Sequence, residues 1–508
     1  MSYNSFLFIG IYLPVCAWLY AHTSQKKRWI ILLAASLLFY ITLSSWLLAV
    51  LLGEAFVTWI IGRKMAALDD MDEKPRRHVE EKRRLARYGI WFLLLILIVL
   101  KYTNFVLETI FSIVHLPFQE LPICVPLGIS YYTLQAISYL CDVRDKKIAA
   151  QPCYWRLVLY LSFFPTIMEG PITRYREVEK QLFAGNDITY ASLCQGSQRI
   201  LWGMFKKIVL ADHMNTAVKT IFTSFTGIGK VTLLGAILCT LQLYMDFSGT
   251  IDIAMGAART FGIFLPENFR QPFFAKDAAD FWRRWHITLG TWLRDYVFYP
   301  VSLSKGAMKL TRKMKKHPFA ARYVGPSLAL FAVWLGNGLW HGPQWTYVLY
   351  GMYYFVLMEA EMLLMKPMAK FYEKKGIEQS AWWLRIVRFI KVFVIVMVGE
   401  LFFRAPSFTV GWTMLKAWFV NFQPGFSILK AKALGGMDPF DILTVCTGMI
   451  IVLIVDILKE GHISIRQLFS QLPLPIRWIV WYTAILVVLV FGAYGPGYDA
   501  VMMMYAGF

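Results

Sequence analysis

The sequence predicts an all-α polytopic membrane protein, and three observations carry that prediction. Of the 508 residues, 57% are hydrophobic and 17% are charged, whereas about 25% charged residues is usual in a soluble domain. The mean hydropathy is +0.50. The apolar residues fall in long runs, and a helix needs about 20 of them to cross a bilayer. We therefore expect about eleven spanning helices, with further re-entrant or interfacial helices.

The apolar runs follow one another along the chain without a repeat or a long linker. They lie near residues 6–21, 29–62 (two segments), 89–114, 121–141, 154–171, 197–212, 230–264, 324–340, 344–365, 382–403, 440–458 and 474–494. The first run has no basic segment before it and no small-residue cleavage site, so we expect it to be a retained span. We expect one membrane domain over residues 1–508, with a motif-rich core at about 120–350.

The formal net charge of +20 gathers in loops between the apolar runs, at residues 63–87, 305–322 and 366–391. This is the distribution of the positive-inside rule, so we place these loops in the cytoplasm. We expect the cations to set topology and to contact anionic lipid, and we expect no nucleic-acid partner.

Several kinds of chemistry have no support in the sequence. The seven cysteines are scattered, no CxxC occurs, and we expect them to be small buried hydrophobes. No zinc spacing, Gly-rich phosphate loop, GxSxG or HExxH motif is present. We therefore expect no metal and no bound cofactor, and neither a serine hydrolase nor a metalloprotease.

The first candidate site is His341, in the turn of a hairpin made by runs 324–340 and 344–365. We expect Gly338, Gly342 and Pro343 to break the helix around it. An ascending arm of about 17 residues, roughly 25 Å at 1.5 Å per residue, would leave His341 inside the bilayer near the external leaflet. His341 is either a general base in a cavity or a core histidine that links helices. We also assign Asn337 and Trp340 to substrate or donor contacts.

The second candidate segment is 281–300, which carries three arginines, three tryptophans and His286. On one helix, Trp282, Arg283 and His286 would share a face. The guanidinium groups of the segment could hold a donor phosphate; these are Arg283, Arg284 and Arg294. An interfacial amphipathic helix explains the same pattern. For Arg294 and Asp295 we favour a local ion pair.

A third cluster is Asp246, Ser248 and Asp252, in a stretch that is apolar on both sides. Acids at membrane depth are functional candidates, and we assign Asp246 and Ser248 to donor contacts. From the residues alone we favour a structural role, in which these acids pair with the arginines of 283–294.

Seven motifs give the chain a recognisable pattern over about residues 120–350. They are Pro126–Gln135, Glu169–Tyr175, Leu243–Gly249, Asn268–Phe273, Phe281–His286, Tyr299–Pro300 and Gly338–Gly342. In their order and spacing the chain resembles the membrane-bound O-acyltransferase family, in particular its alginate O-acetyltransferase branch.

The resemblance implies helices around a central tunnel and transfer of an acyl group, most simply acetyl. It implies a cytoplasmic thioester donor such as acetyl-CoA, with His341 as the catalytic candidate and His286 assisting at the donor side. It further implies an extracytoplasmic SGNH-type transferase as partner, polysaccharide synthesis and export machinery, and a bacterial cytoplasmic membrane.

Three other functions fit part of the pattern. The chain also resembles the D-alanyl transferases of teichoic acid, which take their acyl group from a carrier protein but tend to be shorter. A transporter with broken helices would show an inverted repeat, and none is evident. A structural membrane protein would give the polar residues near 281–295 no purpose.

Overall fold

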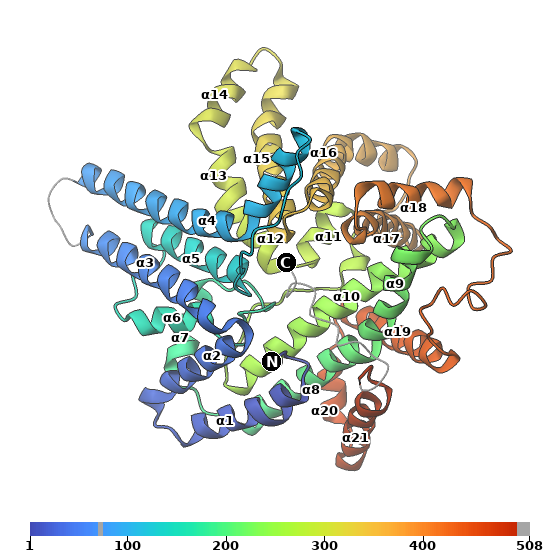
Figure 1. Cartoon of the computed structure of the whole chain (residues 1–508), viewed down its shortest axis with the longest axis horizontal. Coiled ribbons are helices and arrows are strands. Elements are labelled where there is room, and N and C mark those ends of the chain that lie inside the picture. Colours follow the sequence, from blue (N-terminus) through green and yellow to red (C-terminus); the bar gives the residue numbers. More distant parts are fainter. Residues whose placement is uncertain (70–74, 495–508) are drawn as a thin grey trace. The chain divides into compact units, whose positions relative to one another are not determined.

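The computed structural model describes residues 1–69 and 75–494, and within them the chain is helical (Figure 1). The described residues form no strand and one isolated β-bridge, between Phe269 and Trp285. The predicted all-α class is confirmed. Residues 70–74, in the first basic loop, lie outside the described part.

Seven helical segments of the described chain are long and apolar enough to cross a membrane. They are Gln25–Ala67, Arg77–Ile113, Gly229–Thr260, Pro318–His341, Trp345–Lys374, Pro439–Glu460 and Leu474–Phe491. The expected number of about eleven spans stays a prediction, since other apolar runs form shorter helices.

The chain divides into two compact units, and the first contains residues 1–200 and 250–266. Its helices are η1 (Leu7–Tyr12), α1 (Leu13–His22), η2 (Gln25–Lys27), α2 (Arg28–Ser44), η3 (Ser45–Leu47), α3 (Leu48–Ala67), α4 (Pro75–Ile113), α5 (Ile129–Arg144), α6 (Tyr154–Ser162), α7 (Tyr175–Ala184) and most of α8 (Tyr190–Met204).

The second unit contains residues 201–249 and the described residues from 267 onward. It holds all of the candidate site residues except Asp252. Its helices are η4 (Phe205–Ala211), α9 (Asp212–Ser224), most of α10 (Gly229–Thr260), η5 (Pro272–Phe274), α11 (Ala278–Arg284), α12 (Ile287–Leu293), η6 (Arg294–Phe298), α13 (Tyr299–Ser302), α14 (Lys305–Lys313), α15 (Pro318–His341), α16 (Trp345–Lys374), α17 (Trp382–Arg404), α18 (Phe408–Val420), α19 (Pro439–Glu460), α20 (Ile465–Gln471) and α21 (Leu474–Phe491). The expectation of a single domain stays a prediction.

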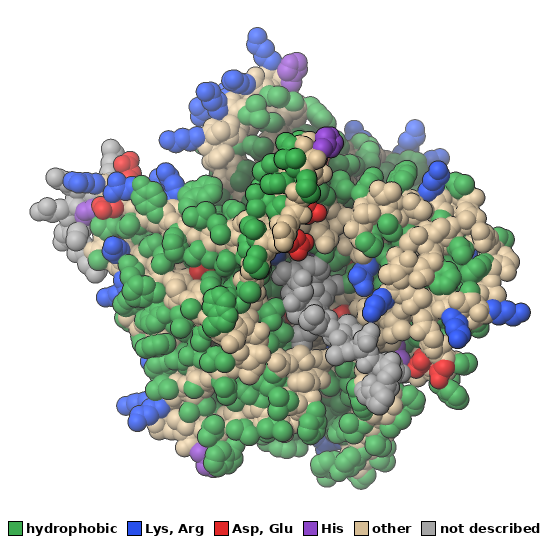
Figure 2. All heavy atoms as spheres, viewed as in Figure 1, with side chains coloured by type: hydrophobic (Ala, Val, Ile, Leu, Met, Phe, Trp, Pro, Cys, Tyr) green, Lys and Arg blue, Asp and Glu red, His purple; other side chains and the backbone are tan. Residues whose placement is uncertain are grey.

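Large apolar side chains are exposed along the candidate spans. On α4, Trp91, Leu95 and Ile98 are 62%, 58% and 46% exposed. Figure 2 shows hydrophobic side chains over much of the face it draws. A surface of this kind is stable against lipid rather than against water.

The basic side chains of 305–316 are exposed, as expected for a solvated loop. Lys305, Lys309, Arg312 and Lys313 lie on α14 and face solvent. Their cytoplasmic placement stays a prediction. Of the cysteines, Cys16, Cys141 and Cys239 are buried, but Cys124 and Cys446 are exposed, so the expectation of burial is wrong for those two.

The predicted hairpin is present as α15 and α16, which pack closely enough for backbone to touch backbone. A Cβ added to Gly338 would lie 2.5 Å from the carbonyl oxygen of Tyr347, and one added to Gly351 would lie 2.3 Å from that of Trp334. Small residues allow such close approach between membrane helices. Gly338 therefore packs the hairpin, and the expectation that it breaks the helix is wrong.

The arm that leads to His341 is longer than expected. Helix α15 begins at Pro318, at a first-turn position that proline favours, and has 24 residues. At 1.5 Å per residue it is about 36 Å long. The length of the arm therefore no longer places His341 short of the far surface, and its depth in the bilayer stays a prediction.

Gly338→Ala is expected to lower the apparent unfolding temperature of the protein in detergent, because the added methyl group meets backbone that has no room to move. Overpacking of this kind costs about 1–3 kcal/mol. Gly336→Ala is the matched control on the same helix, where an added Cβ has nothing within 4 Å. Equal unfolding temperatures for the two variants would contradict the close packing.

Candidate active site

His341 is the last residue of α15, and aromatic rings surround its imidazole. The side chain is 5% exposed. The rings of Tyr350 and Phe403 meet it edge to face, with centroids at 5.9 Å and 5.1 Å and interplanar angles of 88° and 86°. Trp340 lies on another side at 5.1 Å. These contacts come from α15, α16 and α17, so three helices fix the position of one imidazole.

His286 lies at a break between two short helices rather than within one helix. Helix α11 ends at Arg284, Trp285 is extended, and His286 has a left-handed φ of +45° before α12 begins. The predicted shared helical face of Trp282, Arg283 and His286 is therefore wrong. The cause is a backbone pairing with an earlier segment, in which Arg270 N donates to Arg284 O and Ile287 N to Asn268 O, at 2.9 Å and 3.0 Å.

The side chain of Asn268 fixes the orientation of the His286 ring. Its Oδ1 lies 3.1 Å from His286 Nδ1, 3.1 Å from Thr288 N and 2.9 Å from Thr288 Oγ1. The backbone N–H of Thr288 can only donate, so the atom it faces is an oxygen. His286 Nδ1 therefore carries a proton, and in the neutral ring the lone pair lies on Nε2.

The electrostatic setting keeps His286 neutral. The side chain is 2% exposed. Burial, and then the nearby His341, hold the pKa of His286 well below its usual value of 6.5. A neutral imidazole with its lone pair on a known nitrogen can accept a hydrogen bond or a proton.

The two predicted catalytic histidines both lie next to one tryptophan. The ring centroid of Trp340 is 5.5 Å from that of His286 and 5.1 Å from that of His341. Asn337, one turn before His341 on α15, is 3% exposed. Within the described residues its side-chain oxygen has no hydrogen-bond partner. The structure thus brings His286, His341, Trp340 and Asn337 into the same region.

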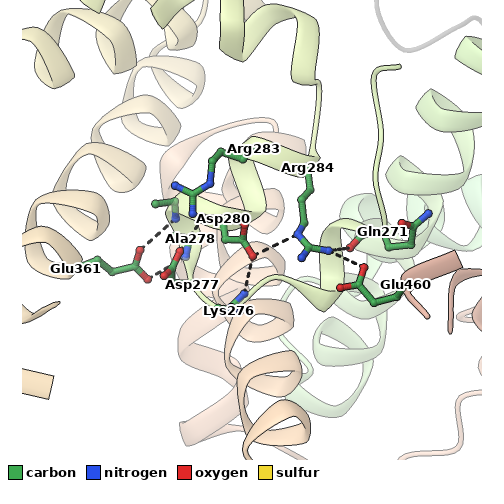
Figure 3. Close-up of polar contacts among 10 residues, drawn as sticks. Gln271, Lys276, Asp277, Ala278, Asp280, Arg283, Arg284, Glu361 and Glu460 are labelled. Carbon is green, nitrogen blue, oxygen red and sulfur yellow. Dashed lines mark hydrogen bonds and ion pairs between the residues drawn. The ribbon is translucent and has the colours of Figure 1, made fainter. Parts of the chain in front are cut away.

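Carboxylates hold helix α11, which leads into His286, at both ends (Figure 3). Asp277 accepts from Asp280 N at 2.7 Å as the N-cap. From α16, the two oxygens of Glu361 accept from Ala278 N and Ala279 N, at 2.9 Å and 3.2 Å. Negative charge stabilises the N-terminus of a helix.

At its other end, α11 is held through Arg284. This guanidinium pairs with Asp280 at 3.3 Å and with Glu460 of α19 at 2.8 Å (Figure 3). Arg283 differs, since it is 67% exposed and lies 3.5 Å from Asp280. The two adjacent arginines therefore differ in their contacts: Arg284 pairs with two carboxylates, whereas most of the Arg283 side chain is exposed to solvent.

The two acids of α10, Asp246 and Asp252, form ion pairs with a lysine and an arginine of the preceding helices. Asp246 lies 3.0 Å from Lys207 Nζ, and Lys206 Nζ donates to Ser248 at 2.9 Å. Lys207 is fully buried and also pairs with Asp212 at 2.7 Å. In the first unit, Asp252 pairs with Arg199 at 2.8 Å. The predicted pairing of Asp246 with the arginines of 283–294 is wrong, because Asp246 forms its ion pair with the buried Lys207.

The remaining two predicted residues of this segment occupy different surroundings. Arg294 pairs with Asp295 at 2.8 Å, which confirms the expected local ion pair, and its side chain is 53% exposed. The ring of Trp282 packs edge to face against Trp334 and Tyr354, at 4.9 Å and 4.8 Å.

Three residues of this region did not stand out in the sequence as members of a site. Asn268 lies eighteen residues before His286, and Glu361 lies on α16, so no local pattern links either to its partner. Glu400 is buried on α17. For Glu361 and Glu400 the available signal was an acid inside a largely apolar helix.

The described residues contain no group of three His, Cys, Asp or Glu side chains arranged to hold a metal ion.

Comparison with known proteins identifies the class to which this fold and site belong. Residues 88–403 match the membrane-bound O-acyltransferase family, which is more than half of the chain. The chain therefore belongs to that family and is a multi-pass membrane acyltransferase.

Three relatives show the range of acyl groups and acceptors named within the family. A probable alginate O-acetylase of Pseudomonas syringae is 29% identical over 442 residues, 86% of this chain and 79% of that protein. A peptidoglycan O-acetyltransferase of Helicobacter pylori is 28% identical, over 82% of this chain and 79% of that protein. A teichoic acid D-alanyltransferase of Bacillus subtilis is 32% identical, over 56% of this chain and 69% of that protein.

Proposed function

We propose that the chain moves an acetyl group from a cytoplasmic thioester donor across a bacterial cytoplasmic membrane, for O-acetylation of a cell-surface polysaccharide. The observation that carries the proposal is the pair of buried imidazoles, His286 and His341, which both lie next to Trp340 within the region that matches the family. The O-acetyl-transferring relatives, which align with most of the chain, support acetyl as the group.

In the proposed reaction His341 is the general base. It takes the proton of the acceptor hydroxyl while that oxygen forms a bond to the thioester carbonyl carbon. The carbon–sulfur bond then breaks, and the proton passes from the imidazolium to the departing thiolate. No covalent enzyme intermediate is needed in this scheme.

We assign His286 to the donor side. Its lone pair on Nε2 accepts a hydrogen bond from an amide or hydroxyl group of the donor, such as the pantetheine arm of acetyl-CoA. Its neutrality avoids repulsion from the imidazolium that forms on His341. Asn268 sets the tautomer that this role requires.

The donor phosphates need cations that a ligand can reach from solvent. Arg283 and Arg294 each have one aspartate neighbour but are 67% and 53% exposed, so we assign them to donor contacts. Arg284 has two carboxylate partners, and we give it the role of holding α11. Trp282, Asp246 and Ser248 stay candidates for contacts to the donor.

Arg283→Ala is expected to raise the KM for acetyl-CoA about 10–100-fold with little change in kcat. One charge-assisted phosphate contact contributes about 1.5–3 kcal/mol, and it does so equally in the ground state and in the transition state. The control is Lys309→Ala, which removes an exposed cation from α14. Steady-state kinetics in proteoliposomes measure both. A KM for Arg283→Ala equal to that of Lys309→Ala would contradict the assignment.

The proposal includes partners outside the chain. The acceptor hydroxyl belongs to the polysaccharide or to an extracytoplasmic SGNH-type transferase that passes the group on, beside the polysaccharide synthesis and export machinery.

The test of the proposed function is reconstitution in vesicles with radiolabelled acetyl-CoA on one side and a hydroxyl acceptor on the other. Label recovered as an ester on the acceptor supports acetyl transfer. In a parallel reaction the donor is D-alanyl carrier protein labelled in its alanine. Ester recovered from that donor alone would replace acetyl by D-alanyl. Movement of intact donor or polysaccharide without ester formation would favour a transporter.

A further inference from the structure

Helix α17 buries a carboxyl group inside an apolar environment. Glu400 is 4% exposed, and its neighbours along the helix, Val396, Met397 and Leu401, are also buried. Taking a carboxyl group out of water is costly unless its oxygens find partners. A buried Glu400 therefore requires a specific interaction.

That interaction is a hydrogen bond from α16. The phenol of Tyr350 donates to Glu400 Oε1 at 3.1 Å. Across the described residues Glu400 makes no ion pair. The carboxyl group is thus held by a tyrosine rather than by a cation, and it ties α16 to α17 at one point.

The same tyrosine packs against the candidate base. The ring of Tyr350 meets His341 at 88°, with centroids 5.9 Å apart. Phe403, three residues after Glu400 on α17, meets His341 at 5.1 Å and Tyr350 at 5.0 Å. Tyr350 and Phe403 therefore pack against the imidazole, and Glu400 holds Tyr350; we call these three residues the bracket.

The bracket continues to the helix that leads into His286. The ring of Tyr354, one turn after Tyr350, lies 5.0 Å from it, and Trp282 of α11 lies 4.8 Å from Tyr354. Gly399 permits this packing, because an added Cβ would lie 2.9 Å from the Tyr354 hydroxyl. A shift of the Tyr350 ring would therefore change the packing of Tyr354 and Trp282.

We propose that Glu400 is a positioning residue for His341, and that it acts by holding the Tyr350 ring against the imidazole. This inference rests on the proposed function for its effect on rate. Edge-to-face rings fix an imidazole only if the rings themselves are fixed, and the Tyr350–Glu400 hydrogen bond is a buried polar contact that holds this ring.

The kinetic test compares Glu400→Ala, Tyr350→Phe and the double variant in the vesicle assay. Each single variant is expected to lower kcat about 100-fold, the loss that accompanies a misplacement of about 1 Å, with KM for the donor nearly unchanged. The double variant is expected to be no slower than either single variant, since both changes remove one interaction. Glu400→Gln, whose amide oxygen still accepts the phenol proton, is expected to stay within about threefold of wild type.

The matched control is a second buried carboxyl group, Glu54 of α3. It is fully buried and accepts a hydrogen bond from Thr133 at 2.9 Å. Glu54→Ala and Thr133→Val should lower the yield of folded protein without lowering kcat per folded molecule. Losses in kcat equal to those at Glu400 would overturn the proposal, because any buried carboxyl group would then have the same effect.

A second readout does not depend on the reaction. The rate at which diethyl pyrocarbonate modifies His341 is measured by peptide mass spectrometry on the full-length protein in detergent. Glu400→Ala and Tyr350→Phe are expected to accelerate it at least about tenfold by loosening the bracket, whereas Glu400→Gln and Glu54→Ala leave it at the wild-type rate.

The two readouts separate the inference from the proposed function. Failure of wild type to transfer acetyl would contradict the function, and the modification rates would still decide the position of His341. Unchanged modification rates in both Glu400→Ala and Tyr350→Phe, or additive kinetic losses in the double variant, would overturn the positioning role.

Discussion

His341→Ala is expected to lower acetyl transfer per folded molecule by about 10²–10⁴-fold, the range that a positioned general base contributes. The reason is that the acceptor hydroxyl then has no neighbouring group to take its proton. The measurement is kcat in proteoliposomes, normalised to folded protein by size-exclusion chromatography. KM for the donor should change little, because the donor contacts lie elsewhere.

The control for this prediction is another buried histidine of the same unit. His213 is 4% exposed, and its Nε2 lies 3.4 Å from Asp441. His213→Ala removes the same volume from a packed region, so it reports the cost of packing alone. If both variants lose activity equally, the effect of His341 is structural and the catalytic assignment is wrong.

Asn268→Ala is expected to lower kcat/KM about 10–100-fold, the usual cost of losing a group that orients a catalytic histidine. Without the Asn268 oxygen the His286 ring can rotate or change tautomer, and α12 loses the acceptor for Thr288 N. Thr288→Val is the control, since it removes one donor to the same oxygen and leaves the ring contact in place.

Asn268→Asp gives the same prediction a pH signature. The substitution keeps an oxygen acceptor but adds a negative charge beside an imidazole whose pKa burial holds well below 6.5. A neighbouring anion favours the charged ring, so the pKa of His286 should rise toward or above its usual value of about 6.5.

The variant should therefore lose activity as the pH falls through the raised pKa, in a range where wild-type His286 is still neutral. The pH dependence of kcat/KM measures this. Coincident acid limbs for Asn268→Asp and wild type would contradict the role of Nε2 as an acceptor.

The sequence was sufficient for the fold class, and it singled out the two histidines that the structure places next to Trp340. A long apolar run in lipid must satisfy its own backbone hydrogen bonds, and the α-helix does so within one segment, so the helices could be predicted. His286 and His341 stood out because a histidine among tryptophans in a membrane protein is costly without a purpose. The family motifs then supplied the expectation that the two belong to one site.

What the sequence could not predict depends on contacts between distant segments. A run such as 281–295 has helical periodicity, and the break at Trp285–His286 arises only from pairing with 268–270. The partner of Asp246 could not be predicted either. Lys207 lies in an apolar run, and the two carboxylates that it contacts, Asp212 and Asp246, belong to different helices. Local spacing contains no information about either choice.

The length of α15 was misjudged for a related reason. Pro326 lies inside the helix, and the basic residues before it suggested a later start. Proline is tolerated within membrane helices when neighbouring groups satisfy the freed backbone.

The measurement that tests the central claim most directly is the O-acetyl content of surface polysaccharide from cells that express wild type or His341→Ala at matched membrane levels. The proposed function predicts ester in the cells with wild type and its loss in the cells with His341→Ala. Equal ester content in the two would contradict catalysis by His341, and no ester in either would contradict acetyl transfer to the polysaccharide.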